Sequence, residues 1–175
     1  MTKSADRDAM PYRRCVGIAV FNADGKVWSG RRIANPETAG KGKHRWQLPQ
    51  GGIDKGEDAL LAAKRELFEE TGIRSVTLLA KVSGWLYYDL PDDLLGKALK
   101  GKYRGQKQRW FAFRFEGDEA EINIEDPPDG SHPEFDQWAW KDLSELPDLI
   151  VPFKRGLYVN VANEFKAFAN KSARK

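Results

Sequence analysis

The sequence predicts an α/β or α+β domain in which a mixed β-sheet is sandwiched between α-helices. Segments rich in β-branched and aromatic residues alternate with two segments of helical period, in the order strands, helix, strands, helix. The 175 residues are 41% hydrophobic, enough to bury one core and too few to suggest two domains. We therefore expect a single domain over residues 1–175, with its core at about 12–168 and short flexible termini.

The first half of the chain is predicted to hold a hairpin, a loop and a helix. Two strands are expected in residues 15–33 around the turn at 22–25, because Asn, Asp and Gly are typical of hairpin turns. Residues 35–45 are rich in Gly, Pro and Lys, which indicates a loop. A short strand in 46–52 then leads into a helix at 57–71.

The second half is predicted to add strands and a closing helix. Residues 76–90 and 106–117 are rich in β-branched and aromatic residues, and 135–143 alternate less cleanly. A helix is expected from Pro152 onward, because apolar side chains recur at helical spacing there, at Leu157, Val161, Phe165 and Phe168.

Composition favours a soluble cytoplasmic protein. No apolar run approaches the roughly 18 residues that a membrane span needs, and the first fifteen residues lack the apolar segment of a signal peptide. The single cysteine, Cys15, lies in an apolar stretch and is interpreted as a core residue. No membrane association and no obligate protein partner are expected.

Charge is unevenly distributed although the net charge is only +3. Residues 96–109 contain six Lys or Arg and no acid, whereas residues 116–129 contain seven acids and no base. This polarity indicates a surface that attracts phosphates on one side; the alternative is a solvated basic loop without a binding role.

The helix at 57–71 carries a cluster of carboxylates. At about 100° per residue, Glu66, Glu69 and Glu70 share one face, apart from the apolar stripe of the helix. Arg65 lies at the right spacing to pair with Glu69, but one guanidinium cannot neutralise three carboxylates. Hard oxygen ligands of this kind suit Mg²⁺ or Mn²⁺; the alternative is an acidic helix face exposed to solvent.

Glycines precede this helix and favour the metal interpretation. Gly51, Gly52 and Gly56 allow the backbone to approach a ligand closely. The segment is not a phosphate-binding P-loop, because Glu57 and Asp58 stand where that motif needs Lys and Ser or Thr. A loop that supplies oxygens, followed by a helix that supplies carboxylates, describes a metal site better.

The segment 51–73 resembles the Nudix box, GX5EX7REUXEEXGU with U apolar, at every defined position. The resemblance implies the Nudix fold and Mg²⁺-dependent hydrolysis of a phosphoanhydride, with Mn²⁺ as a substitute. It also implies roles for individual side chains. Arg65 is expected to orient the carboxylates and Glu57 to support Arg65 or the loop. The implied metal ligands are Gly51, Glu66, Glu69 and Glu70, with Glu69 or Glu70 polarising water.

Most of the chain, from Tyr12 to about Phe165, is similar to the bacterial RNA pyrophosphohydrolases within this family, a group that overlaps with the plant-type dinucleoside tetraphosphate hydrolases. In that group a glutamate near the metals corresponds to Glu134, as a further ligand or the general base; the alternative is an ordinary loop acid. The resemblance implies these substrate-binding residues: Arg13, Arg32, Gln50, Tyr87, Lys107, Phe153 and Lys154.

Physical chemistry suggests how such residues bind. Arg32 and Phe153 are suited to stack on either side of a base, and Arg13 and Lys154 to hold phosphates. Phe153 as a core residue and Arg13 as a surface charge are the plainer alternatives. Tyr87 and Tyr88 alternate on one strand, so that one ring points inward and the other outward, and either is a candidate to face the nucleotide.

Two enzymatic activities and two other roles follow from the resemblance. The first activity removes pyrophosphate from the 5′-triphosphate end of RNA, leaving a 5′-monophosphate and promoting mRNA decay. The second splits dinucleoside polyphosphates such as Ap4A into ATP and AMP. A non-catalytic nucleotide-binding module is disfavoured by the complete set of carboxylates, and hydrolysis of oxidised nucleoside triphosphates by the additional segments outside the box.

Overall fold

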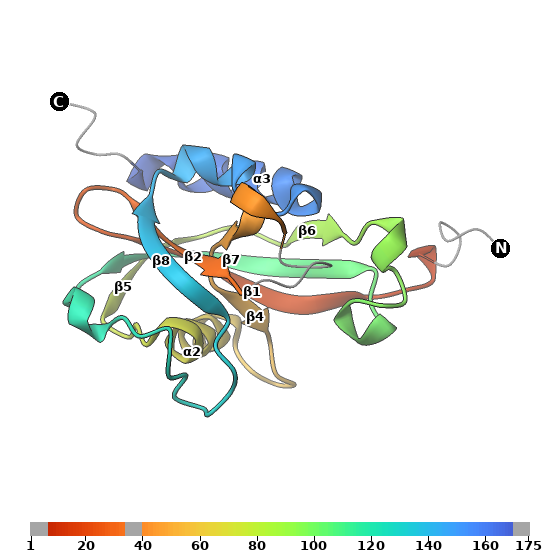
Figure 1. Cartoon of the computed structure of the whole chain (residues 1–175), viewed down its shortest axis with the longest axis horizontal. Helices are drawn as coiled ribbons and strands as arrows, with labels where there is room; N and C mark the ends of the chain where they lie inside the picture. The colour runs from red at the N-terminus through yellow and green to blue at the C-terminus, as the bar shows by residue number, and fades with distance from the viewer. Residues whose placement is uncertain (1–6, 34–39, 170–175) are drawn as a thin grey trace.

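The computed structural model describes residues 7–33 and 40–169, and within them eight strands form one sheet (Figure 1). The central order is β3-β2-β1-β7-β5; in addition, β4 pairs with β1, β6 with β7 and β8 with β2. The strands are β1 (Tyr12–Phe21), β2 (Val27–Arg32), β3 (Trp46–Gln47), β4 (Gln50–Gly52), β5 (Val76–Lys81), β6 (Leu86–Asp89), β7 (Gly105–Phe115) and β8 (Phe135–Lys141).

Two α-helices lie on opposite sides of this sheet, α2 (Ala59–Thr71) on one and α3 (Arg155–Phe165) on the other (Figure 1). Short 3-10 turns connect the elements: η1 (Gly42–Arg45), η2 (Asp92–Leu94), η3 (Leu99–Gly101), η4 (Glu119–Glu121), η5 (Leu143–Asp148), η6 (Pro152–Lys154) and η7 (Lys166–Phe168). The predicted mixed sheet between helices is confirmed.

The sheet is mixed because its two longest strands run parallel. β1 and β7 pair in parallel from Tyr12↔Gly105 to Phe21↔Arg114, and the other strand pairs are antiparallel. Side chains alternate between the two faces along each of these strands. Ala19 and Phe21 of β1 therefore pack toward α3, whereas Val16 and Ile18 pack toward α2.

Helix α2 begins and ends where its capping residues dictate. The Asp58 carboxylate accepts a hydrogen bond from the Leu61 N–H at 3.2 Å, so the helix starts at Ala59 and not at Glu57 as expected. At the other end Gly72 adopts φ +75° and donates its N–H to the Phe68 carbonyl at 2.8 Å. The predicted left-handed ending at Gly72 is confirmed.

Other elements differ from the prediction in their extent. The segment 76–90 forms two strands, β5 and β6, because the chain turns between them at Gly84, whose φ is +78°. The turn at 22–25 is present, but β1 and β2 pair in register only at Phe21↔Val27, after which β2 pairs with β8. The closing helix starts as the 3-10 turn η6 at Pro152 before it continues as α3.

Parts of the expected loop and termini lie outside the described residues. Of the predicted loop 35–45, the structure describes only 40–45, which includes η1. The termini that we expected to be flexible lie outside the description at 1–6 and 170–175. Within the described part of the chain, no helix has the length and apolar character needed to cross a membrane.

Candidate functional site

Arg65 lies at the centre of the carboxylate cluster on α2. Its Nε and Nη2 donate to the two oxygens of Glu57 at 2.8 and 2.9 Å, and Nη2 also donates to the Gly52 carbonyl at 2.9 Å. Its Nη1 donates to Glu66 at 2.9 Å and to Glu69 at 3.1 Å. One guanidinium therefore connects the loop to two carboxylates of the helix, and the predicted pairing with Glu69 is confirmed.

Among the hydrogen bonds of the described residues, Glu70 differs from Glu66 and Glu69 because its donor is a backbone N–H. Its Oε2 accepts a hydrogen bond from the Gln50 N–H at 3.2 Å. Burial, together with the negative charges of Glu134 and Glu66, raises the pKa of Glu70 well above its usual value. Burial also raises the pKa of Glu66, although Arg65 opposes this rise. A cation beside Glu70 would offset the cost of burying its negative charge and the repulsion from Glu134 and Glu66.

A cavity of about 160 Å³ lies among these side chains. Acidic side chains and one histidine supply much of its lining, namely Glu66, Glu69, Glu70, Glu134, Asp129 and His132. Sequence reasoning missed Asp129, because it lies in an acidic run that is typical of a solvated loop. The available signal was that Asp129 lies close to Glu134 in the sequence. The structure brings this segment before β8 to the helix, so both residues line the cavity.

The absence of a side chain at Gly51 makes room for this cluster. A Cβ at Gly51 would lie 2.0 Å from Cδ of Glu66, which is a clash, whereas the backbone dihedrals of Gly51 lie outside the positive-φ region. A side chain at this position would displace the carboxyl group of Glu66, so the glycine allows Glu66 to lie against β4. Gly56 has the other property of glycine, since its φ is +79°.

The donor set fits a hard divalent cation by the kind of its oxygens. In residues 7–33 and 40–169, no three His, Cys, Asp or Glu side chains are already arranged to hold a metal ion. The hydrogen bonds to Arg65 explain this, because they turn the carboxylates of Glu66 and Glu69 toward the guanidinium. Glu66, Glu69 and Glu70 nevertheless all line the acidic cavity.

A second cavity, of about 350 Å³, lies on the α3 side of the sheet. Aromatic, basic and amide side chains line it, including Arg32, Gln50, Tyr88, Gln106, Phe153 and Lys154. Gln50 lies between the two cavities, because its N–H binds Glu70 of the acidic cavity at 3.2 Å and the residue itself lines the second cavity. The structure thus brings four of the predicted substrate residues together beside the carboxylates: Arg32, Gln50, Phe153 and Lys154.

Lys154 is unusual because its amine is buried, with 3% of the residue exposed. Nζ donates to Gln47 Oε1 at 3.0 Å and lies 5.0 Å from the centre of the Tyr88 ring. Burial, with a further contribution from the charge of Arg32, lowers the pKa of Lys154 to about 7. An anion in this cavity would stabilise the charged amine.

Arg13 extends along the same face of the sheet toward the loop of the carboxylate cluster. A Cβ at Gly52 would lie 2.5 Å from Nη2 of Arg13, so the glycine leaves space for the guanidinium. The charge of Arg13 also acts to lower the pKa values of Glu66 and Tyr88. Arg13 is therefore between the carboxylates and the second cavity.

The structure does not bring Tyr87 and Lys107 to this cavity, and their role in substrate binding stays a prediction. The two residues are cross-strand partners on β6 and β7, so their side chains share a face of the sheet. That face is opposite to the one with Tyr88 and Gln106, the next pair along. Of the two tyrosines, Tyr88 lines the cavity, and its ring centre lies 5.8 Å from that of Phe153.

Comparison with known proteins agrees with this geometry. The family model described as NUDIX domain matches residues 11–161. A protein of Mesorhizobium japonicum named RNA pyrophosphohydrolase is 57% identical over 169 residues, covering 96% of this chain and 98% of the relative. A protein of the same name from Rhizobium meliloti is 61% identical over 158 residues, covering 89% of this chain and 94% of the relative.

Solved structures show the same fold at low sequence identity. The MutT protein of Methanosarcina mazei Go1 has a TM-score of 0.61 at 22% identity, covering 90% of this chain and 97% of that one. A C. elegans Ap4A hydrolase in a binary complex has a TM-score of 0.58 at 20% identity, with coverage of 89% and 98%. The family model, the relatives and the carboxylate helix agree, and the chain belongs to the NUDIX family.

Proposed function

We propose that this chain is a Mg²⁺-dependent RNA pyrophosphohydrolase, which removes pyrophosphate from the 5′-triphosphate end of RNA and leaves a 5′-monophosphate. The observation that carries the proposal is that Gln50 lies between an acidic cavity and a cavity with aromatic and basic walls. A nucleotide has a matching division into a base and a charged phosphate chain. The relatives named RNA pyrophosphohydrolase, at 57% and 61% identity, support this assignment.

The acidic cavity is proposed to hold the metal through Glu66, Glu69, Glu70 and Glu134, with the loop at Gly51 beside them. Mg²⁺, or Mn²⁺ in its place, supplies charge screening for the phosphates and lowers the pKa of bound water. Arg65 and Glu57 hold the helix and loop in their relative positions. A carboxylate of the cluster, Glu69, Glu70 or Glu134, takes the proton as water oxygen bonds to phosphorus and the P–O–P bond breaks.

The second cavity is proposed to bind the first nucleotides of the RNA. Phe153 and Arg32 line it and present a ring and a guanidinium for stacking on a base. Tyr88 lies beside Phe153 and adds to the aromatic wall. Lys154 and Arg13 face the phosphates, and the amine of Lys154 gains charge when an anion enters.

Mixed-substrate incubation tests this function. Triphosphorylated RNA and Ap4A are incubated together with the protein and Mg²⁺, and the products are identified by mass. We expect pyrophosphate and 5′-monophosphate RNA to form first. Faster formation of ATP and AMP would assign the chain to dinucleoside polyphosphate hydrolysis instead. Absence of both product pairs, in a protein that still binds these nucleotides, would make it a binding module.

The cellular setting belongs to the same proposal. We propose that the chain acts as a single domain in the cytoplasm, where triphosphorylated RNA is produced, and that promoting mRNA decay is its role there. Fractionation of cells followed by detection of the protein tests the location. Recovery in the membrane fraction would contradict it.

A further inference from the structure

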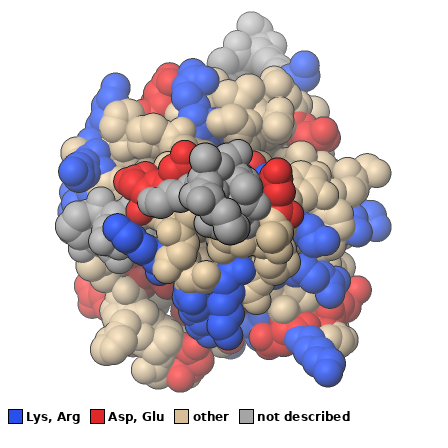
Figure 2. Space-filling view, turned by 90° about the vertical axis from the view of Figure 1, so that its right-hand side faces the viewer, with Lys and Arg blue, Asp and Glu red and all other residues tan. Residues whose placement is uncertain are grey.

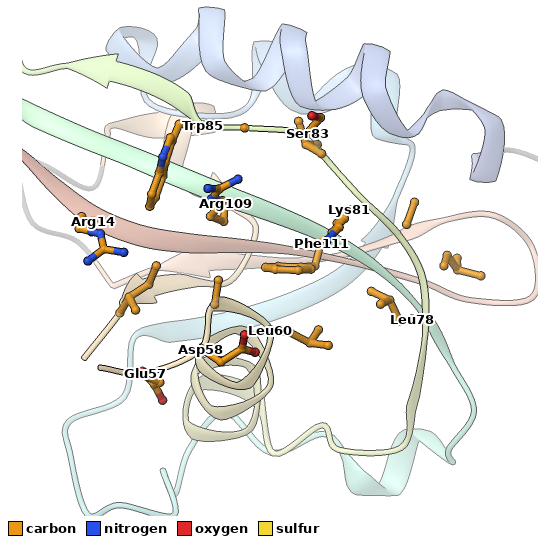
Figure 3. A pocket seen from close by; sticks show the side chains of 16 residues that line it. Arg14, Glu57, Asp58, Leu60, Leu78, Lys81, Ser83, Trp85, Arg109 and Phe111 are labelled. Atoms are coloured by element: carbon orange, nitrogen blue, oxygen red, sulfur yellow. The ribbon is translucent and has the colours of Figure 1, made fainter. Parts of the chain in front are cut away.

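A larger cavity, of about 700 Å³, lies on the α2 side of the sheet and has no part in the proposed hydrolysis. It runs from the N-terminal end of α2 to β5 and the chain before β6 (Figure 3). Phe111 and Leu78 give it an apolar wall, and Arg14, Trp85 and Arg109 are grouped at one end (Figure 3). Arg14 and Arg109 make this end of the cavity positively charged.

Three cations surround the ring of Trp85. The guanidinium of Arg109 lies 4.5 Å from the ring centre, Lys107 Nζ 4.8 Å and the guanidinium of Arg14 5.6 Å. Like charges this close repel one another. The negative face of the indole ring offsets part of the repulsion and holds the cations in place.

Among the described residues, Arg14, Lys107 and Arg109 form no salt bridge. Acids at the border of the surface have other partners: Glu57 binds Arg65, Asp58 caps α2, and Asp89 binds Arg104 at 2.9 Å. Three cations without an acidic partner form a site for an anion with several charges.

Aromatic rings continue the surface beyond Trp85. Tyr87 is paired across the strands with Lys107, which is in turn in register with Arg14. The Tyr87 residue is 49% exposed, and its ring meets that of Tyr12 edge-on at 5.0 Å. An exposed ring beside cations that form no salt bridge among the described residues is a combination that binds single-stranded nucleic acid, by stacking and by phosphate contact.

This surface lies next to the proposed catalytic loop. The Arg14 carbonyl accepts a hydrogen bond from the Ile53 N–H at 3.0 Å, directly after the Gly51–Gly52 segment. Arg13, one residue earlier on β1, faces the other side of the sheet. Figure 2, which looks toward the end of the molecule where β1 begins, shows a group of basic side chains below the centre, on the α2 side.

We propose that Arg14, Trp85, Tyr87, Lys107 and Arg109 form a second binding surface, which holds single-stranded RNA downstream of the 5′ end. Trp85 positions the cations, the cations bind phosphates, and the ring of Tyr87 stacks with a base. The identity of this RNA as the body of the substrate rests on the proposed function. Binding of RNA to the surface does not, and can be measured separately.

The first experiment uses a 12-nucleotide single-stranded RNA with a 5′-hydroxyl, which lacks the reacting phosphates. Binding is measured by fluorescence anisotropy over a range of salt concentrations. Arg14→Gln/Arg109→Gln is expected to weaken binding about tenfold and to reduce the slope of log K against log salt by about 1.4, for two phosphate contacts. Lys64→Gln/Arg74→Gln, an equal change of charge at exposed positions elsewhere, serves as the control.

Two results would rule out RNA binding by this second surface. One is failure of the wild-type chain to bind this RNA at low salt, and the other is equal weakening by the control and test variants. Tyr87→Ala keeps the test decisive if the double variant does not fold, because Tyr87 is exposed. Its RNA affinity is expected to fall about fivefold or more, from the loss of stacking; wild-type affinity in this variant would contradict the role of its ring.

Hydrolysis measurements test the downstream RNA surface separately from the proposed function. KM is compared for a triphosphorylated dinucleotide and a triphosphorylated 12-nucleotide RNA. Arg14→Gln/Arg109→Gln is expected to raise the KM of the long substrate about tenfold more than that of the short one. Equal changes in KM would overturn the downstream surface while leaving the proposed function intact. If the wild-type chain cleaves neither RNA, the proposed function fails. The binding experiment then decides by itself whether the second surface binds RNA.

Discussion

Replacing Lys154 by methionine is expected to remove a rise in stability between pH 7 and pH 9. The buried amine has a pKa of about 7 in the folded chain, against a usual value of 10.5. Below pH 7 the amine is protonated in both states, so the folded state bears the full cost of burying the charge. Between the two pKa values the unfolded state binds more protons, and stability therefore increases with pH.

The magnitude follows from the two pKa values. Each pH unit between them corresponds to about 1.4 kcal/mol, so the full difference is about 5 kcal/mol. Between pH 7 and pH 9 this amine alone is expected to add about 2 kcal/mol to the free energy of unfolding. Above pH 9 Cys15 acts in the opposite direction, because burial raises the pKa of its thiol to about 11.

Urea unfolding at constant ionic strength, without divalent metal and with tryptophan fluorescence as the signal, measures this effect. The wild-type chain should gain stability from pH 7 to pH 9, and Lys154→Met should not. Lys81→Met, at an exposed position, is the matched control and should keep the wild-type dependence. The same pH dependence in Lys154→Met as in the wild type would refute a buried amine with a lowered pKa.

Three further substitutions test the proposed site. Gly51→Ala places a Cβ against the carboxyl group of Glu66 and is expected to lower kcat about 100-fold in a chain that still folds; unchanged turnover, with folding confirmed by circular dichroism, would contradict the steric role. Arg65→Lys cannot reproduce the forked contacts to Glu57, Glu66 and Glu69, so kcat should fall about 10- to 100-fold in steady-state assays; wild-type kcat would rule out its orienting role. Phe153→Ala should raise the KM for triphosphorylated RNA about tenfold with a smaller effect on kcat, and an unchanged KM would exclude base stacking on this ring.

The carboxylate cluster was predictable from sequence because its geometry is local. Helical spacing alone places Glu66, Glu69 and Glu70 on one side of α2 and brings Arg65 to Glu69. The start of the helix was less predictable, since it depends on whether Asp58 or its neighbour provides the cap.

The substrate side of the site depends on tertiary structure, and prediction was weaker there. Alternation along β6 separates Tyr87 from Tyr88, but which ring faces α3 is decided by how the strand pairs with β7. Asp129 is far from the box in sequence and reaches the carboxylates of α2 only through the fold. The burial of Lys154 likewise follows from the packing of η6 against the sheet, which no local pattern indicates.

A magnesium titration of triphosphorylated RNA hydrolysis tests the central proposal most directly. The wild-type chain and Glu70→Gln are compared at each Mg²⁺ concentration, with pyrophosphate release and the 5′-monophosphate end both measured. Turnover should require Mg²⁺ in the wild type, stop on addition of EDTA, and fall about 100-fold or more in Glu70→Gln at saturating metal. Full turnover by Glu70→Gln, or wild-type turnover that persists in EDTA, would contradict a metal-dependent carboxylate site.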